Sequence, residues 1–94
     1  MAFYTYIIAN RRNGTLYTGS TDGLIQRTTQ HREKTFVGFT AKYGCATLVW
    51  FEPHDSRTAA FIRERRIKKW RRAWKLELIE KTNPGWRDLF EDLF

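Results

Sequence analysis

Three short runs rich in aromatic and β-branched residues predict three β-strands. They cover Phe3–Ala9, Thr15–Gly19 and Thr47–Glu52, and Pro53 is expected to end the third. Asn13-Gly14, the favoured pair where backbone φ must be positive, predicts a tight turn between the first two strands. These two strands are therefore expected to be antiparallel. The pattern leaves open where the third strand pairs.

Helical periodicity fills most of the remaining chain. A helix from about Gly23 to Lys34 follows the possible capping residues Ser20-Thr21-Asp22, and a long helix from about Arg57 into the 70s follows Asp55-Ser56. Residues 35–44 are expected to form a loop. The breaker Asn83-Pro84-Gly85 precedes a short amphipathic tail. Strands mixed with helices predict an α+β fold in which helices pack on a sheet, built as a single domain over residues 1–94.

Composition narrows the class of protein. The 94 residues are 41% hydrophobic and 29% charged, as in ordinary soluble domains, and their net charge is +7. Nucleic acid is the natural polyanionic partner for such a charge. No apolar run is long enough for a membrane span and no signal peptide is visible. Cys45 is alone, which excludes an intramolecular disulfide and a cysteine metal cluster. We therefore expect a cytoplasmic protein without a membrane partner.

One polar residue interrupts the apolar face of the long predicted helix. Positions four or three apart form a single stripe, namely Ala60, Glu64, Ile67, Trp70, Trp74 and Leu78. Because an unpaired buried charge is costly, the carboxylate of Glu64 requires a partner. That partner is either one of the many arginines or a bound cation, since Mg²⁺ prefers oxygen ligands. The tryptophans of the stripe are expected in the core.

Four further side chains have types that suit phosphate chemistry. Arg27 and His31 are four residues apart and share a face of the first predicted helix. A guanidinium can stabilise charge on a phosphate, and an imidazole can hold a phosphate oxygen, orient water or move a proton. Tyr6 and Tyr17 are either sheet aromatics or phenols that activate water beside a cation. Each of these residues also has an ordinary structural interpretation.

Basic residues surround the tryptophans of the long helix. They are expected either to follow a nucleic-acid backbone or simply to keep the helix face solvated. The candidates for nucleic-acid binding are Arg27, Arg63, Lys68, Lys69, Arg71 and Arg72. Phosphate-binding loops, dinucleotide fingerprints, zinc ligand sets and serine triads are missing from the sequence.

Taken in order, these residues resemble the GIY-YIG nuclease domain. Tyr4-Thr5-Tyr6 stands where the family has Gly-Ile-Tyr, and Tyr17-Thr18-Gly19 stands where it has Tyr-Ile-Gly. Both tyrosines and the second glycine are kept, whereas the first glycine and both isoleucines are replaced. Arg27, His31 and Glu64 match the arginine, the histidine or tyrosine, and the metal-binding glutamate of the family.

The whole chain is also similar to the small stand-alone bacterial branch of this family, the UPF0213 type. The similar segments are Gly38–Tyr43, Ile67–Lys75 and Asn83–Leu89. Within the last segment, Asn83 is similar to a polar residue that many members place late in the domain to steady the site.

The resemblance implies a three-stranded antiparallel sheet flanked by helices. It also implies DNA cleavage with one Mg²⁺ or Mn²⁺ ion on Glu64, a water activated by Tyr6 or Tyr17, and phosphate charge stabilised by Arg27. Branched, nicked or single-stranded DNA are the candidate substrates of a monomer that takes its specificity from structure or from a partner protein. The alternatives are a nucleic-acid-binding module without useful cleavage and an assembly protein that uses the aromatic residues of the tail.

Overall fold

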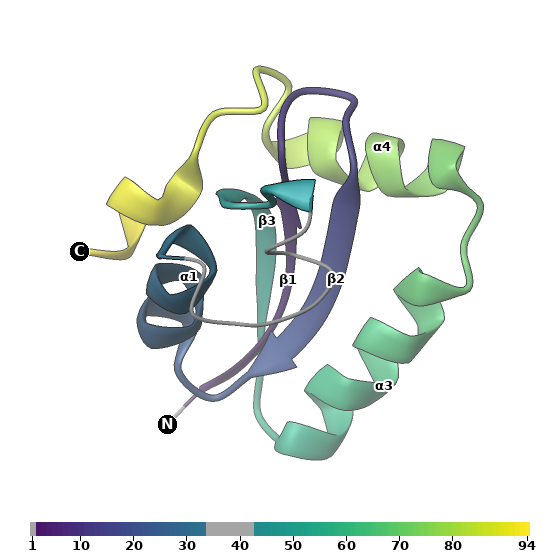
Figure 1. The fold of residues 1–94 in the computed structure, drawn as a ribbon. Helices are drawn as coiled ribbons and strands as arrows, with labels where there is room; N and C mark the ends of the chain where they lie inside the picture. Colours follow the sequence, from purple (N-terminus) through teal and green to yellow (C-terminus); the bar gives the residue numbers. More distant parts are fainter. Residues whose placement is uncertain (1, 34–42) are drawn as a thin grey trace.

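A computed structural model describes residues 2–33 and 43–94. In chain order the elements are β1 (Phe3–Ala9), β2 (Leu16–Thr21), α1 (Leu24–Arg32), β3 (Thr47–His54), α3 (Arg57–Lys68), α4 (Arg72–Thr82) and the 3₁₀ helix η1 (Leu89–Leu93). The expected α+β fold is confirmed (Figure 1). The loop predicted over residues 35–44, with most of the Gly38–Tyr43 segment, lies largely outside the described residues. Within the described part, no helix is long and apolar enough to cross a membrane.

The sheet has the strand order β2-β1-β3, and both pairings are antiparallel. β1 is the central strand, so its residues from Thr5 to Ala9 are buried on both faces. The prediction that Pro53 ends the third strand is wrong, because β3 continues to His54 and Pro53 pairs with Tyr4. A proline is tolerated there because β3 is an edge strand, where a backbone N–H can be missing without breaking a ladder.

The turn between β1 and β2 depends on the predicted Asn-Gly pair. Asn13 takes a φ of 56°, in the left-handed region that asparagine tolerates. Gly14 is required for space, because a Cβ atom there would lie 2.0 Å from Oδ1 of Asn10. That same oxygen accepts a hydrogen bond from the backbone N–H of Thr15 at 2.9 Å. The side chain of Asn10 therefore stabilises the turn by a hydrogen bond across it.

The prediction of one long helix is wrong, because α3 ends at Lys68 and α4 begins at Arg72. A straight helix over residues 57–82 would be about 39 Å long, whereas the longest dimension of the Cα trace is 29 Å. The break turns the chain back over the sheet (Figure 1), so that Ile67 and Ile79 enter the same core cluster. As a result Trp70 is half-buried but Trp74 is 48% exposed, and the predicted stripe ends at the break.

The expected caps are confirmed for one helix and not for the other. The side chain of Ser56 caps α3 as predicted. α1 instead begins after Gly23, without a hydrogen bond from a capping side chain. Thr21 accepts from the backbone N–H of Gly23, and Asp22 forms an exposed ion pair with Arg57 at 2.8 Å. Thr21 therefore stabilises the end of β2, and Asp22 links this segment to the start of α3.

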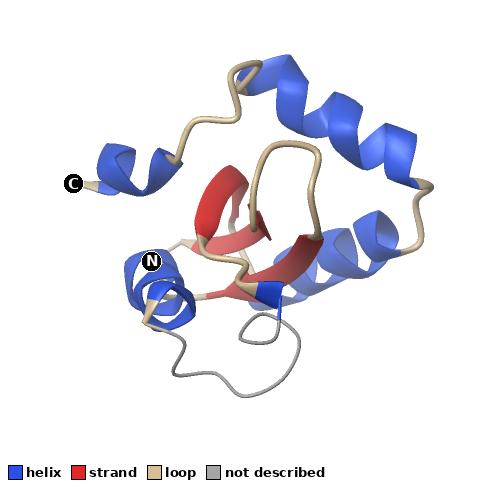
Figure 2. Ribbon diagram, turned by 45° about the horizontal axis from the view of Figure 1, so that its top comes forward, coloured by secondary structure: helices blue, strands red, loops and turns tan. Residues whose placement is uncertain are grey.

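Helices cover both faces of the sheet (Figures 1 and 2). On one face, α1 and η1 enclose a cluster that includes Tyr6, Ile8, Leu24, Cys45 and Leu48. On the other, α3 and α4 enclose a cluster that includes Ile7, Val49, Trp50, Ile67, Ile79 and Trp86. Because side chains alternate along a strand, Tyr6 and Tyr17 point to the α1 face, while Thr5 and Ser20 point to the α3 face.

The C-terminal segment is fixed by polar contacts with β3. The buried amide of Asn83 donates to the carbonyl oxygens of Val49 at 3.1 Å and Arg87 at 2.8 Å. Val49 lies at the irregularity of the β1–β3 pairing, where its side of the ladder has one extra residue. Asp88 accepts from the backbone N–H of Leu48 at 3.2 Å. Asn83 therefore supports the edge strand β3, on the side of the sheet away from β2.

Candidate active site

Gly19 and Tyr6 face each other across β1 and β2. A Cβ atom on residue 19 would lie 2.6 Å from the phenolic oxygen of Tyr6 and 2.7 Å from its Cζ. The Tyr6 ring therefore lies directly across the backbone of Gly19. This contact gives a physical reason for glycine in the second sequence motif.

Three rings gather on the α1 face around this contact. The phenolic oxygen of Tyr6 lies 3.0 Å from Nε2 of His31, and both residues are buried. The Tyr17 ring centroid is 6.4 Å from that of Tyr6 and 5.5 Å from that of His31. Tyr17 is only half-buried. Of the two tyrosines, Tyr17 is the one that solvent and a substrate can reach more easily.

Burial sets the protonation state of the Tyr6–His31 pair. It raises the pKa of the Tyr6 phenol above its ordinary value near 10, with a further contribution from the neighbouring Tyr17. It lowers the pKa of His31 to about 4, and the charge of Arg27 adds to this effect. Near neutral pH, therefore, a protonated phenol meets a neutral imidazole.

Arg27 belongs to the same group of residues, one helical turn before His31 on α1. By its charge and by a hydrogen bond it acts to lower the pKa of Tyr6, against the larger effect of burial. The side chain is half-buried. The predicted grouping of Arg27, His31 and Tyr6 thus corresponds to a real neighbourhood in the fold.

Glu64 lies on α3, at the opposite face of the sheet, with a side chain that is 12% exposed. The Ser20 hydroxyl donates to its Oε1 at 2.6 Å, and the ammonium of Lys68 lies 2.8 Å from its Oε2. The ion-pair alternative is thus realised, although the partner is a lysine one helical turn away and not an arginine. The sequence pattern predicts Ser20 as a capping residue of the helix that follows it. Strand alternation, which places it on the α3 face, is the signal that could have found its role.

The edge strand β2 separates Glu64 from the rings, and Lys68 joins the two sides. Its Nζ atom lies 5.8 Å from the centroid of the Tyr17 ring while it pairs with Glu64. A cavity of about 250 Å³ opens beside the carboxylate, lined by Phe61, Glu64, Arg65, Lys68 and Lys69. The charge of Glu64 also contributes to the raised pKa of Tyr6. Lys68 therefore links Glu64 to Tyr17 at the edge strand β2.

The residues present fit a metal site with a single protein carboxylate. Among residues 2–33 and 43–94, no three histidine, cysteine, aspartate or glutamate side chains gather to hold an ion. Mg²⁺ often uses one or two carboxylates and takes its other ligands from water and phosphate. Glu64, beside an open cavity and the Ser20 hydroxyl, can supply that one carboxylate.

The basic residues expected to bind nucleic acid differ in how they are held. Arg63 pairs with Glu52 at 3.1 Å, and its guanidinium lies over the Trp70 ring. Its charge is therefore engaged in contacts within the protein, on the α3 face of the sheet. Lys69 and Arg71 are exposed at the break between α3 and α4. Arg72 donates to backbone carbonyls of the β1–β2 turn.

Comparison with known proteins identifies the family of this chain. The family model of the GIY-YIG catalytic domain matches residues 2–77, and the chain belongs to this family. The family is one of nucleases, which act on nucleic acid.

Proteins of the UPF0213 group are similar along most of the chain. A UPF0213 protein of Clostridium perfringens is 37% identical over 80 residues, which are 85% of this chain and 85% of the relative. One of Syntrophus aciditrophicus is 38% identical over 82 residues, or 86% of this chain and 92% of the relative. The solution NMR structure of a UPF0213 protein from Bacillus halodurans has a TM-score of 0.57 and 25% identity, and covers 94% of this chain and 93% of its own.

Proposed function

We propose that this protein hydrolyses phosphodiester bonds of DNA with the help of one divalent metal ion on Glu64. The observation that carries the proposal is the convergence of Tyr17, Lys68 and Glu64 at the edge of β2. Membership of a nuclease family supports it. The net charge of +7 suits a polyanionic substrate.

The two tyrosines take different roles in this proposal. Tyr6 is buried and protonated at neutral pH, so it positions His31 and supports Gly19. Tyr17 is more open, and its ring centroid lies 5.8 Å from Nζ of Lys68, so it orients the attacking water. After its own phenolic proton has passed to solvent, the phenolate takes a proton from that water. The sequence leaves this choice open, and the difference in burial between the two rings supports the division.

The substrate phosphate lies at the exposed edge between Tyr17 and Glu64. The oxygen of water attacks phosphorus, the bond from phosphorus to the leaving oxygen breaks, and solvent protonates that oxygen. Arg27 stabilises the added negative charge on the phosphate. A divalent ion, when bound, would polarise the phosphate and offset charge on the leaving oxygen. Lys68, whose ammonium pairs with Glu64, would have to release that carboxylate to the ion.

The test is cleavage of nicked, branched and single-stranded DNA with Mg²⁺, Mn²⁺ or EDTA. Tyr17→Phe should lower the cleavage rate by about 10²- to 10⁴-fold, the usual contribution of general acid-base catalysis, while DNA binding is retained. Tyr6→Phe should lower the rate less. Glu64→Gln should abolish metal-dependent cleavage. The matched control is Tyr4→Phe, because Tyr4 lies on the same strand and face as Tyr6. The Tyr4 ring packs edge-on against Phe51.

A second candidate function is a nucleic-acid-binding module that keeps the fold without cleavage. The observation that favours it is the engagement of both Glu64 oxygens, by Ser20 and Lys68. Salt-sensitive DNA binding by the wild-type protein, without cleavage in any metal, would support this alternative and contradict the nuclease proposal.

A further inference from the structure

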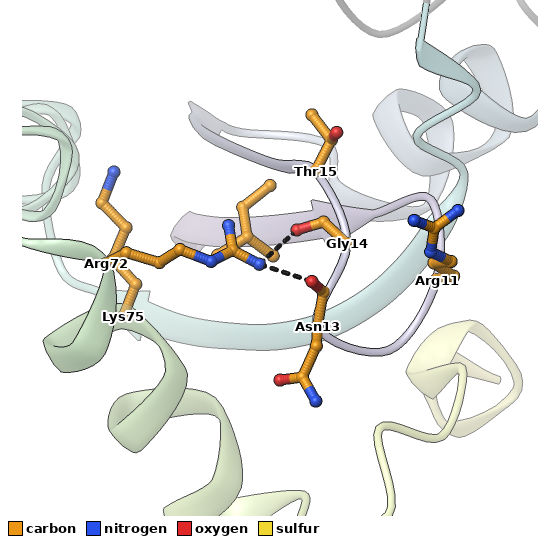
Figure 3. A pocket seen from close by; sticks show the side chains of 7 residues that line it. Arg11, Asn13, Gly14, Thr15, Arg72 and Lys75 are labelled. Atoms are coloured by element: carbon orange, nitrogen blue, oxygen red, sulfur yellow. Dashed lines mark hydrogen bonds between the residues drawn. The ribbon is translucent and has the colours of Figure 1, made fainter.

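A second basic site lies at the turn between β1 and β2, apart from the residues discussed as catalytic. A cavity of about 480 Å³ opens between this turn and the first turns of α4 (Figure 3). Arg11 comes from the turn, and Arg72 and Lys75 come from α4. The seven residues that line it include these three cations and no acidic side chain. An anion is the ligand that such a lining would attract.

Arg72 organises this cavity. Its Nη2 atom donates to the carbonyl oxygens of Asn13 at 2.7 Å and Gly14 at 2.6 Å, as the dashed lines in Figure 3 show. These bonds occupy the two acceptors that would otherwise repel an anion at the turn. A guanidinium has five N–H donors, so further donors remain for a ligand. Arg72 therefore holds the turn against α4 and leaves the cavity positive.

None of the three cations has a counter-ion in the described part of the chain, and Lys75 is the most buried of them. Its side chain is half-buried. Burial and the charges of Arg72 and Lys68 lower the pKa of its ammonium. A bound anion would offset the repulsion between these charges and stabilise the half-buried ammonium. Lys68, which pairs with Glu64, is among the charges that act on Lys75.

The spacing suits two phosphates a few nucleotides apart on one nucleic-acid strand. Leu16 lines the cavity, and Ser20, which donates to Glu64, lies four residues further along β2. At about 3.3 Å per residue, this is roughly 13 Å. Along the axis of a duplex one strand carries a phosphate about every 3.4 Å, so a span of this length parallel to the axis covers about four nucleotides.

We propose that the cavity lined by Arg11, Arg72 and Lys75 binds a backbone phosphate a few nucleotides from the phosphate that is cut. This inference rests on the proposed function for its geometry. The ligand is the phosphodiester group itself, which DNA and free phosphate share in chemistry. The site holds the strand in register along β2.

The test measures binding of a fluorescein-labelled oligonucleotide by fluorescence anisotropy, between 50 and 200 mM salt. EDTA is present throughout, so that metal-dependent cleavage cannot occur. The test variant is Arg11→Gln with Lys75→Gln, which spares the bonds of Arg72 to the turn. The matched control is Arg12→Gln with Lys81→Gln, which removes the same charge from exposed positions of the same turn and helix. Circular dichroism checks that both variants fold.

The test variant should bind about tenfold more weakly at low salt, and its slope of log K against log salt should fall by about 1. The control should stay within about twofold of the wild type. Equal weakening in both variants would mean that only total charge matters and would overturn the site. A second result would also overturn the site. In that result, inorganic phosphate shifts the NMR amide signals of Gly14 and Thr15 in the wild type while the test variant and the control bind the oligonucleotide equally well; the cavity would then bind free anion only.

The cleavage assay separates this inference from the proposed function. If the test variant loses binding but the wild type never cuts DNA, the phosphate site stands and the nuclease proposal fails. If the wild type cuts DNA and both variants bind equally, the nuclease proposal stands and the phosphate site fails.

Discussion

Replacing Gly19 with alanine should destabilise the protein and disturb the candidate site together. The new Cβ would lie 2.6 Å from the phenolic oxygen of Tyr6 and 2.7 Å from Cζ, far inside ordinary contact distances. The ring cannot simply swing away, because Tyr6 is 1% exposed and its oxygen lies 3.0 Å from Nε2 of His31. Either the ring tilts and the contact with His31 is lost, or β1 and β2 move apart.

The magnitude follows from two opposing effects. Overpacking a filled core typically costs about 1 to 3 kcal/mol. Alanine restricts the unfolded chain more than glycine does, which returns about 0.4 to 1 kcal/mol. The free energy of unfolding should therefore fall by about 0.5 to 2.5 kcal/mol. For a domain of this size, each kcal/mol corresponds to about 4 to 8 °C in Tm, so we expect a Tm roughly 2 to 20 °C lower.

Differential scanning calorimetry and urea unfolding measure this change. Gly85→Ala is the matched control, because a Cβ there meets nothing within 4 Å, and its Tm should be unchanged or slightly higher. In a Tyr6→Phe background the alanine should cost less, since the closest of the clashing atoms is gone. A Gly19→Ala protein with the wild-type Tm and an undisturbed His31 NMR signal would refute the reasoning.

Three other predictions concern charge and hydrogen bonding. Lys68→Met removes the ammonium that competes for Glu64, so Mn²⁺ affinity, followed by electron paramagnetic resonance, should rise by about 1.5- to 5-fold, the value of an ion pair of 0.2 to 1 kcal/mol; an unchanged or lower affinity would contradict this. His31 has a pKa of about 4 when folded and near 6.5 when unfolded, so the unfolded chain binds the extra proton between these values. Urea unfolding should therefore show stability falling as the pH is lowered from 6.5 to 4, more steeply than in His31→Gln; equal slopes would count against the buried neutral state. Asn83→Ala leaves the Val49 carbonyl without its donor and should lower the free energy of unfolding by about 1 to 3 kcal/mol, with DNA affinity kept; a loss of affinity without a loss of stability would place Asn83 in the site.

Local patterns were enough to predict much of this protein. Runs rich in aromatic and β-branched residues identified all three strands, and Asn13-Gly14 identified the hairpin that sets Tyr6 opposite Gly19. The single carboxylate on an apolar stripe pointed to Glu64, whose need for a partner follows from burial alone. These features depend on neighbours within a few residues, and such short-range preferences are written directly in the sequence.

The break between α3 and α4 was decided by the tertiary structure. Lys69 and Trp70 continue a helical pattern, and nothing in their residue types demands a stop. The chain turns there because Ile67 and Ile79 bury against the same sheet, a gain that no local pattern records. Trp74, expected in the core, is left exposed by that turn.

The same distinction holds for the chemistry. The sequence supplied Tyr6, Tyr17, His31 and Glu64 as candidates, but not their states. Only the packing of α1 against β1 makes the Tyr6–His31 pair neutral, because desolvation depends on what surrounds a group from every direction. Only the position of β2 at the edge of the sheet lets Lys68 reach both Glu64 and Tyr17. Composition and periodicity fix which groups a chain can offer, whereas contacts between distant segments fix which of them meet and which charges they can carry.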